Sequence, residues 1–139
     1  MVAIGRPGER LGAGRLPSTD KAWRKLARML MRQAKFILII PGLSEGVSWE
    51  INFISAWYTA KTIYIMPPAK FFKGKNEALR EDWEKMKWRH FGRSKSFPPY
   101  DEKGALFRVD RNGEVTDALP FATRFGNTQI RHLIPALGR

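Results

Sequence analysis

The stretch AKFILIIPGLSEGVSWE, residues 34–50, decides the fold, because it joins an apolar run to a helical pattern through a glycine-containing turn. Residues 36–40 are all apolar and rich in β-branched side chains, which is typical of a strand covered on both faces of a parallel sheet. Pro41 and Gly42 end the run. The sequence therefore predicts a buried strand that leads through a short turn into a helix.

A carboxylate follows this turn closely. Ser44 and Ser48 are both candidate N-caps, and Glu50 then falls in the first helical turn, where the helix dipole favours a negative side chain. In open α/β sheets, ligands bind at the carboxyl ends of the strands. We therefore expect Glu50 to be a functional carboxylate. The alternative is a favourable first-turn charge without further role, and the residues leave both readings open.

Strands and helices alternate along the rest of the chain. Apolar patterns predict strands at residues 2–4, 36–40, 61–66 and 105–109, and helices at residues 18–34, 49–58, 76–91 and 128–137. Residues 92–103 are polar and contain proline, which indicates a loop, and Asn112-Gly113 indicates a hairpin turn. We expect a single α/β domain over residues 1–139, with three layers, a mainly parallel sheet and a C-terminal hairpin at its edge.

Composition limits the chemistry of the chain. Of its 139 residues 43% are hydrophobic, and none is cysteine, so disulfides, thiolate catalysis and Cys-based zinc sites are excluded. The lack of cysteine fits a reducing compartment. No apolar run approaches the roughly 20 residues that span a bilayer. We expect a cytoplasmic protein.

Positive charge is concentrated near the start of the chain. The net charge is +12, and residues 1–35 hold nine Lys or Arg against two acids. A phosphate-bearing ligand, nucleic acid or an anionic membrane surface would each complement this excess, and charge alone does not choose among them. A solvated, solubilising surface is the simpler alternative. We rank a nucleotide-like ligand first and expect nucleic acid not to be the physiological partner.

Several common chemistries find no support. The phosphate-loop motif G-x-x-x-x-G-K-[ST] is absent. His90 and His132 are the only histidines, and H-E-x-x-H is missing, so we predict neither a metal nor a cofactor. Residues 42–46 match G-x-S-x-G letter for letter, but Pro41 interrupts the strand and no downstream histidine is well placed. A serine nucleophile at Ser44 is therefore the weaker reading.

A second glycine-rich segment covers residues 5–14. It follows the first predicted strand, as a phosphate-binding loop would, and its arginines would suit a diphosphate. Its spacing does not match G-x-G-x-x-G. A surface loop without a ligand is the alternative.

The residues around the first turn resemble a known superfamily. They look like the TIR-like and nucleoside 2-deoxyribosyltransferase-like proteins. The pattern consists of Ile39-Ile40-Pro41, then Ser44, Gly46 and Trp49-Glu50, then the strand Lys61-Thr62-Ile63-Tyr64-Ile65. The resemblance implies a flavodoxin-like or TIR-like fold. It also implies a serine-containing loop before a helix that bears the catalytic glutamate, here Glu50, and a lysine-led strand after it.

This resemblance implies cleavage or transfer at an N-glycosidic bond of NAD or a nucleoside. Glu50 would stabilise or attack the positive charge that develops on the ribose ring. Ser44 would position a ribose or phosphate oxygen, and Trp49 would pack on a ring or belong to the core. The predicted ligand-binding residues are Gly42, Ser44, Gly46, Ser48, Trp49, Gly5, Arg6 and Gly8. The alternative is a non-catalytic module for signalling, ligand binding or assembly, including assembly with its own copies.

A longer resemblance covers the first half of the chain. This part of the chain resembles the cytosolic region of bacterial multi-pass membrane proteins of uncharacterised function. The residues that carry the resemblance are Ile4 to Glu9, Leu11-Gly12-Ala13, Arg15, Asp20, Trp23, Ala34 and Trp49-Glu50. In that group the domain follows transmembrane helices. The resemblance implies that upstream segments of a longer protein are missing here, and that a membrane segment tethers the domain to the inner face of the membrane.

Overall fold

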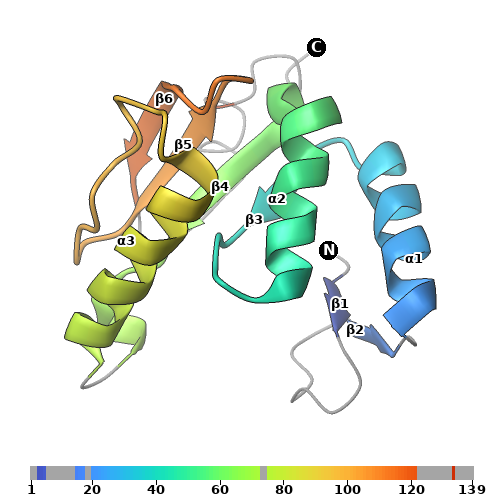
Figure 1. Ribbon diagram of the computed structural model, residues 1–139, viewed down its shortest axis with the longest axis horizontal. Coiled ribbons are helices and arrows are strands. Elements are labelled where there is room, and N and C mark those ends of the chain that lie inside the picture. Colours follow the sequence, from blue (N-terminus) through green and yellow to red (C-terminus); the bar gives the residue numbers. More distant parts are fainter. Residues whose placement is uncertain (1–2, 6–14, 18–19, 73–74, 122–132, 134–139) are drawn as a thin grey trace. The chain divides into compact units, whose positions relative to one another are not determined.

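The computed structural model describes residues 3–5, 15–17, 20–72, 75–121 and 133 (Figure 1). The chain divides into two compact units, residues 1–35 and residues 36–139. The single domain over residues 1–139 stays a prediction.

The first unit contains a parallel strand pair and one helix. Strand β1 (Ala3–Gly5) pairs with β2 (Arg15–Pro17), and helix α1 spans Asp20–Gln33. Trp23, Ala27 and Met31 are buried at helical spacing, as their periodicity predicted. The predicted strand at residues 2–4 and helix at residues 18–34 are confirmed within two residues. Most of the predicted loop at residues 5–14 lies outside the described residues.

The second unit is built on a mixed four-stranded sheet. Strands β3 and β4 are adjacent and parallel, with Ile37 opposite Thr62, as the sequence predicted. The other two pairings are antiparallel, so the prediction of a mainly parallel, flavodoxin-like or TIR-like sheet is wrong. The hairpin at Asn112-Gly113 is confirmed. In spatial order the strands are β3 (Ile37–Ile39), β4 (Thr62–Met66), β5 (Ala105–Val109) and β6 (Val115–Pro120).

Two helices of this unit lie on one face of the sheet (Figure 1). Helix α2 spans Glu45–Trp57 and helix α3 spans Asn76–Phe91, and short 3-10 helices η1 (Thr59–Lys61) and η2 (Ala69–Phe71) flank β4. Helix α3 coincides with its prediction, whereas α2 begins before the predicted residue 49. Of the predicted helix at residues 128–137, only Leu133 is described.

The loop between α3 and β5 explains why β5 runs antiparallel. After α3 the chain does not enter the sheet at the amino ends of the strands. Residues 92–104 instead run back along α3. The ring of Phe97 stacks on Phe91 at 4.1 Å between centroids, and Trp83 Nε1 donates to the carbonyl of Pro98 at 2.9 Å. The chain therefore reaches Ala105 beside the end of β4 and turns back along that strand.

Gly104 makes this reversal possible. Its φ angle is 73°, in the left-handed region that favours glycine, and an added Cβ would lie 2.7 Å from the carbonyl oxygen of Met66. Any other residue would collide with the backbone of β4.

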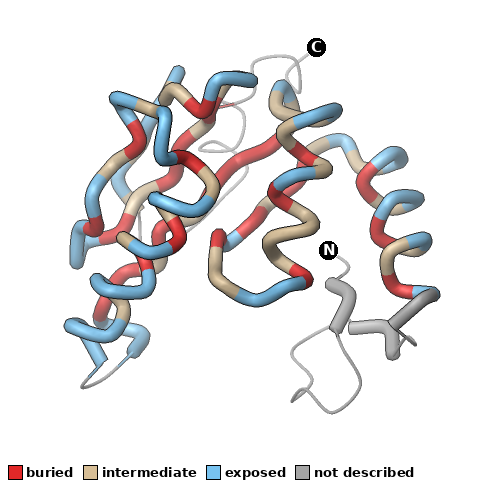
Figure 2. The backbone as a smooth tube through the Cα atoms, viewed as in Figure 1, coloured by how far each residue is buried: buried red, intermediate tan, exposed pale blue. Residues whose placement is uncertain are grey.

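The core lies on both faces of the sheet, and Figure 2 shows burial concentrated along the central strands. On the helical face, Tyr64 and Phe107 stack at 5.8 Å and meet rings from α3 and its following loop. On the opposite face, Ile63, Leu106 and Leu133 have no exposed surface. Alternate residues of one strand thus support two separate packing layers.

Glu114 fastens the loop after α3 to the β5–β6 hairpin. Its carboxylate accepts hydrogen bonds from the hydroxyl and the backbone amide of Ser96, from the backbone amide of Lys95 at 2.9 Å and from the Ser94 hydroxyl at 3.3 Å. These bonds, that from the Ser96 hydroxyl first, hold the pKa of Glu114 below its ordinary value of 4.5.

We expect Glu114→Gln to lower the free energy of unfolding at neutral pH, because the amide cannot replace an ionised acceptor of several hydrogen bonds. A depressed carboxyl pKa contributes stability above the unfolded-state pKa, and this stability is lost as the pH falls through the folded-state pKa. The gap between wild type and variant should therefore close in acid. Urea unfolding over a pH series measures it, with the exposed Glu102→Gln as control. A gap that is constant with pH would contradict this account.

Candidate functional site

The β3–α2 turn occupies the carboxyl end of a parallel strand, where sequence analysis placed the site. Pro41 is buried and redirects the chain beyond β3. Ser44 has extended backbone angles, and its Oγ accepts a hydrogen bond from the Val47 amide at 3.3 Å, so Ser44 is the N-cap of α2.

This cap corrects the predicted position of Glu50. Because α2 begins at Glu45, Ser48 lies inside the helix and Glu50 falls in its second turn, not in the first. The acidic residue of the first turn is Glu45. With 3.6 residues per turn, Glu50 lies about 200° around the helix from Ser48. The half-buried Glu50 is therefore on a different flank of α2 from Ser48.

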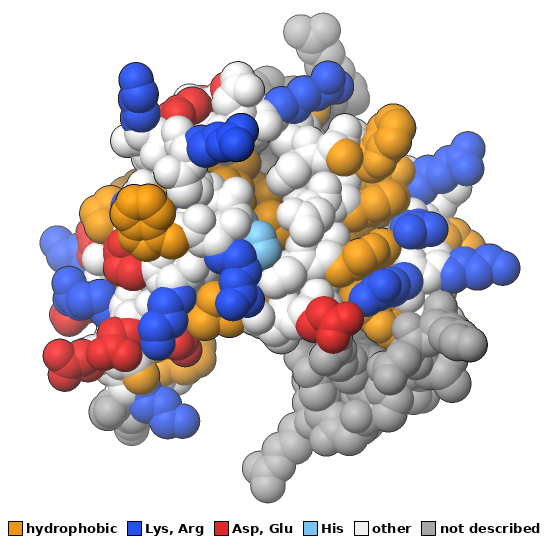
Figure 3. Space-filling view, in the orientation of Figure 1, with side chains coloured by type: hydrophobic (Ala, Val, Ile, Leu, Met, Phe, Trp, Pro, Cys, Tyr) orange, Lys and Arg blue, Asp and Glu red, His pale blue; other side chains and the backbone are white. Residues whose placement is uncertain are grey.

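Two residues of α3 reach this turn. Arg89 Nη1 donates to the carbonyl oxygen of Leu43 at 3.1 Å. Ser48 Oγ and His90 Nε2 are hydrogen-bonded at 3.2 Å across the α2–α3 boundary. Figure 3 shows this histidine, in pale blue, open to the surface between the two helices. Sequence analysis missed both residues as site members, since no local pattern links α3 to a turn more than forty residues earlier.

The environment of His90 keeps its ring neutral. Burial lowers the pKa of His90, and the adjacent positive charge of Arg89 lowers it further. At neutral pH the uncharged imidazole therefore has one ring nitrogen to donate and one to accept. An anion bound beside Arg89 would act in the opposite direction and raise the pKa of His90.

The other predicted ligand residues fall into three groups. Four of them lie close together in the β3–α2 turn and at the start of helix α2: Gly42, Ser44, Gly46 and Ser48. Trp49 stacks on Phe53 of the same helix at 5.3 Å between centroids, so one face of its ring is already covered. Gly5 belongs to β1, and Arg6 and Gly8 lie outside the described residues.

Gly42 is a glycine that the fold does not require. Its backbone is not in the left-handed region, and an added Cβ would have its nearest neighbour, Val47 Cγ1, at 4.0 Å. An alanine would fit there. The position is therefore open for a ligand to approach the backbone.

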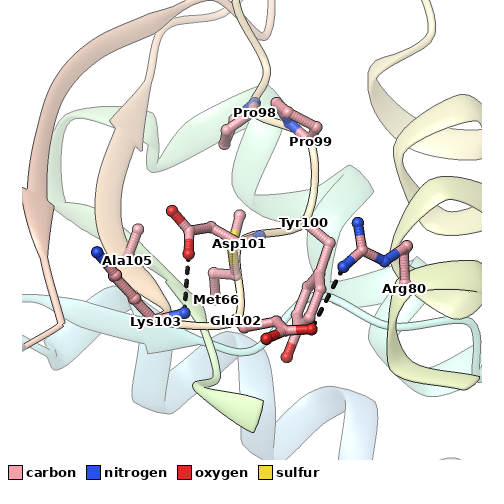
Figure 4. Close-up of a pocket in the computed structure, with 9 residues that line it drawn as sticks. All are labelled: Met66, Arg80, Pro98, Pro99, Tyr100, Asp101, Glu102, Lys103 and Ala105. Carbon is pink, nitrogen blue, oxygen red and sulfur yellow. Dashed lines mark hydrogen bonds and ion pairs between the residues drawn. The ribbon is translucent and has the colours of Figure 1, made fainter. Parts of the chain in front are cut away.

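A pocket of about 550 Å³ lies elsewhere, at the carboxyl end of β4 (Figure 4). Its polar groups are already engaged: Tyr100 donates to the carbonyl of Pro67 at 3.0 Å, and Arg80 pairs with Glu102 at 3.4 Å. None of the ligand residues predicted from the sequence lines it. The lining residues are Met66, Arg80, Pro98, Pro99, Tyr100, Asp101, Glu102, Lys103 and Ala105.

In comparisons with known proteins, no family model, curated protein or solved structure matches the chain. The two resemblances noted in the sequence therefore stay predictions. Within the described residues, no helix has the length and apolar character needed to cross a membrane, and no cluster of three or more His, Asp or Glu is arranged to hold a metal.

We expect Ser44→Ala to lower the free energy of unfolding by about 1 kcal/mol, because the Val47 amide loses its capping oxygen. Ser44→Asp should retain most of the stability, since aspartate caps equally well and its charge suits the helix N-terminus. Thermal or urea unfolding of both variants measures the difference. If the two variants lose equal stability, Ser44 does not cap α2 through its side chain.

Proposed function

We propose that this protein binds a phosphate-bearing ligand of the nucleotide class at the β3–α2 turn. The observation that carries the proposal is the arrival of Arg89 and His90 at the amino end of α2, a place already favourable to anions. A helix N-terminus presents amide donors and a partial positive charge, and the Gly46 amide has no acceptor within the helix. A guanidinium adds charge and directed hydrogen bonds to phosphate oxygens.

Two further features bear on affinity. The net charge of +12 favours approach of an anion from solution. Exposed Glu45 in the first turn of α2 opposes a highly charged ligand, so we expect modest affinity that falls with added salt. The nucleotide part of the proposal rests on the resemblance to TIR-like and nucleoside 2-deoxyribosyltransferase-like proteins. A place in the cytoplasm rests on the composition, and a place at the inner face of the membrane rests on the resemblance to bacterial multi-pass membrane proteins.

Arg89→Gln should weaken binding of ADP-ribose or ADP about tenfold or more, because it removes a charged phosphate contact while keeping a polar side chain. Calorimetric titration measures this, with adenosine as the ligand that lacks phosphate. Arg80→Gln is the matched control, since Arg80 lies on the same helix but pairs with Glu102 in the separate pocket. Equal losses in both variants, or equal affinity for adenosine and ADP, would overturn the proposed site.

Gly42→Ala tests the same site from the opposite side of the turn. The fold has room for the methyl group, so stability should be unchanged or slightly raised. Ligand affinity should nevertheless fall, because the methyl group would occupy the approach to the backbone. A variant with normal affinity would place the phosphate away from Gly42.

Turnover through Glu50 is the catalytic form of the proposal. Glu50→Gln keeps the size of the side chain but removes the charge that an oxocarbenium-like transition state requires. Any NAD glycohydrolase or nucleoside transferase activity should fall about a hundredfold or more, while ligand affinity should stay within about a factor of three, because the phosphate contacts assigned to Arg89 and the helix N-terminus are unchanged. Product formation by chromatography measures this.

The non-catalytic alternative makes a different prediction for the same assay. If the wild-type chain binds nucleotide but releases no nicotinamide or free base, the module is a binding or assembly domain, with or without association of its own copies. If Glu50→Gln retains full turnover, the catalytic carboxylate is another residue.

A further inference from the structure

Two phenylalanines are held out of the core directly beyond strand β4. Phe71 is 60% exposed and Phe72 is 37% exposed, although neighbouring Ala69 is buried. They follow Pro67-Pro68 in and after the 3-10 helix η2. Neither ring lines the pocket of Figure 4.

The backbone of this turn is fixed by hydrogen bonds. The Ala69 amide donates to the carbonyl of Glu102 at 2.9 Å, the Phe72 amide to the carbonyl of Ala69 at 2.9 Å, and the Lys75 amide to the carbonyl of Phe72 at 3.1 Å. Between Ala69 and Phe72 the backbone is thus held by hydrogen bonds while both rings are exposed. Docking through them would require little further ordering of the backbone, which lowers its entropic cost.

The charge on the residues next to the rings is mainly positive. Lys70 and Lys75 are exposed on either side of the two phenylalanines, and residues 67–76 contain no Asp or Glu. Two acidic side chains lie close by in the fold: exposed Glu77 in the first turn of α3, two residues after Lys75, and Glu102, which pairs with Arg80. An apolar tip flanked by lysines complements a surface that has anionic groups in its outer layer and apolar material below them.

We propose that the η2 turn docks this protein on an anionic lipid surface. Phe71 and Phe72 would enter the boundary between headgroups and acyl chains, while Lys70 and Lys75 meet the phosphate and carboxylate groups of the lipids. Two rings and two lysines form a small anchor, so the binding is reversible and depends on the anionic lipid content.

The geometry favours lipid over single-stranded nucleic acid. Nucleic acid requires stacking faces along a charged groove that follows the backbone. Here Lys70 Nζ lies 5.4 Å above the ring of Phe71, and the ring meets Phe121 edge to face at 6.0 Å, so a base has restricted access to it. A lipid surface needs only the exposed edge of the rings and imposes no such stacking.

The test is co-sedimentation of the full chain with phosphatidylcholine vesicles that contain about 30% phosphatidylserine, compared with pure phosphatidylcholine. Phe71→Ser with Phe72→Ser should reduce the partition coefficient about tenfold or more, since it removes the inserted apolar surface but leaves the net charge unchanged. Trp88→Ser is the matched control, because Trp88 is 73% exposed but lies on α3. It should bind as the wild type does.

A second variant separates charge from insertion and guards against misfolding. Lys70→Gln with Lys75→Gln should weaken binding to anionic vesicles and lower its dependence on salt. Equal melting temperatures of all variants should accompany these results.

Three results would overturn the proposal. The double phenylalanine variant could bind as the wild type does, which would assign binding to basic surfaces elsewhere. Trp88→Ser could lose as much binding, which would make the effect non-specific. Alternatively, single-stranded RNA could bind more tightly than the vesicles at the same salt and lose that affinity in the phenylalanine variant.

Discussion

The enclosure of strand β4 is the constraint on which the second unit depends. β4 is paired on both edges, in parallel with β3 and antiparallel with β5. Ile63 and Tyr64 point to opposite faces and neither has exposed surface. Burial raises the pKa of the Tyr64 hydroxyl to about 12, an effect that Ser55 partly offsets, yet the hydroxyl has no well-formed hydrogen bond to the described residues. Such burial costs free energy, and the ring contacts with Phe91 and Phe107 offset it.

The crowded helical face of β4 also assembles the candidate site. Because α2 and α3 both cover this face, their side chains meet, and Ser48 bonds to His90 although 42 residues separate them. A sheet with helices on opposite faces would have kept these two residues apart. The packing of α2 and α3 on one face of the sheet therefore brings Arg89 to the β3–α2 turn, where it donates to the carbonyl of Leu43.

Local sequence patterns predicted the positions of helices and strands well, but they predicted the direction of the strands relative to one another poorly. Helix α3 and strand β5 were predicted at their observed bounds, because apolar periodicity and Gly or Pro residues mark them. The direction of β5 depended on aromatic side chains within residues 92–103, a segment whose polar and proline content indicated only a loop. For the site, the turn around Ser44 was predicted from neighbouring residues. Arg89 and His90 were missed, because their contact with the turn exists only after α3 has packed.

The parallel pairing of β3 and β4 gives the two proposals a common origin. Parallel neighbours end at the same edge of a sheet, so the turn after β3 and the turn after β4 leave from one edge. One turn leads into α2 and carries the proposed phosphate site, and the other carries Phe71 and Phe72. A protein docked by the second turn would hold the first close to the lipid headgroups, where cations are attracted and soluble anions are repelled. If both proposals hold, docking should weaken binding of a soluble nucleotide. The shared sheet edge would then couple ligand affinity to lipid charge through electrostatics.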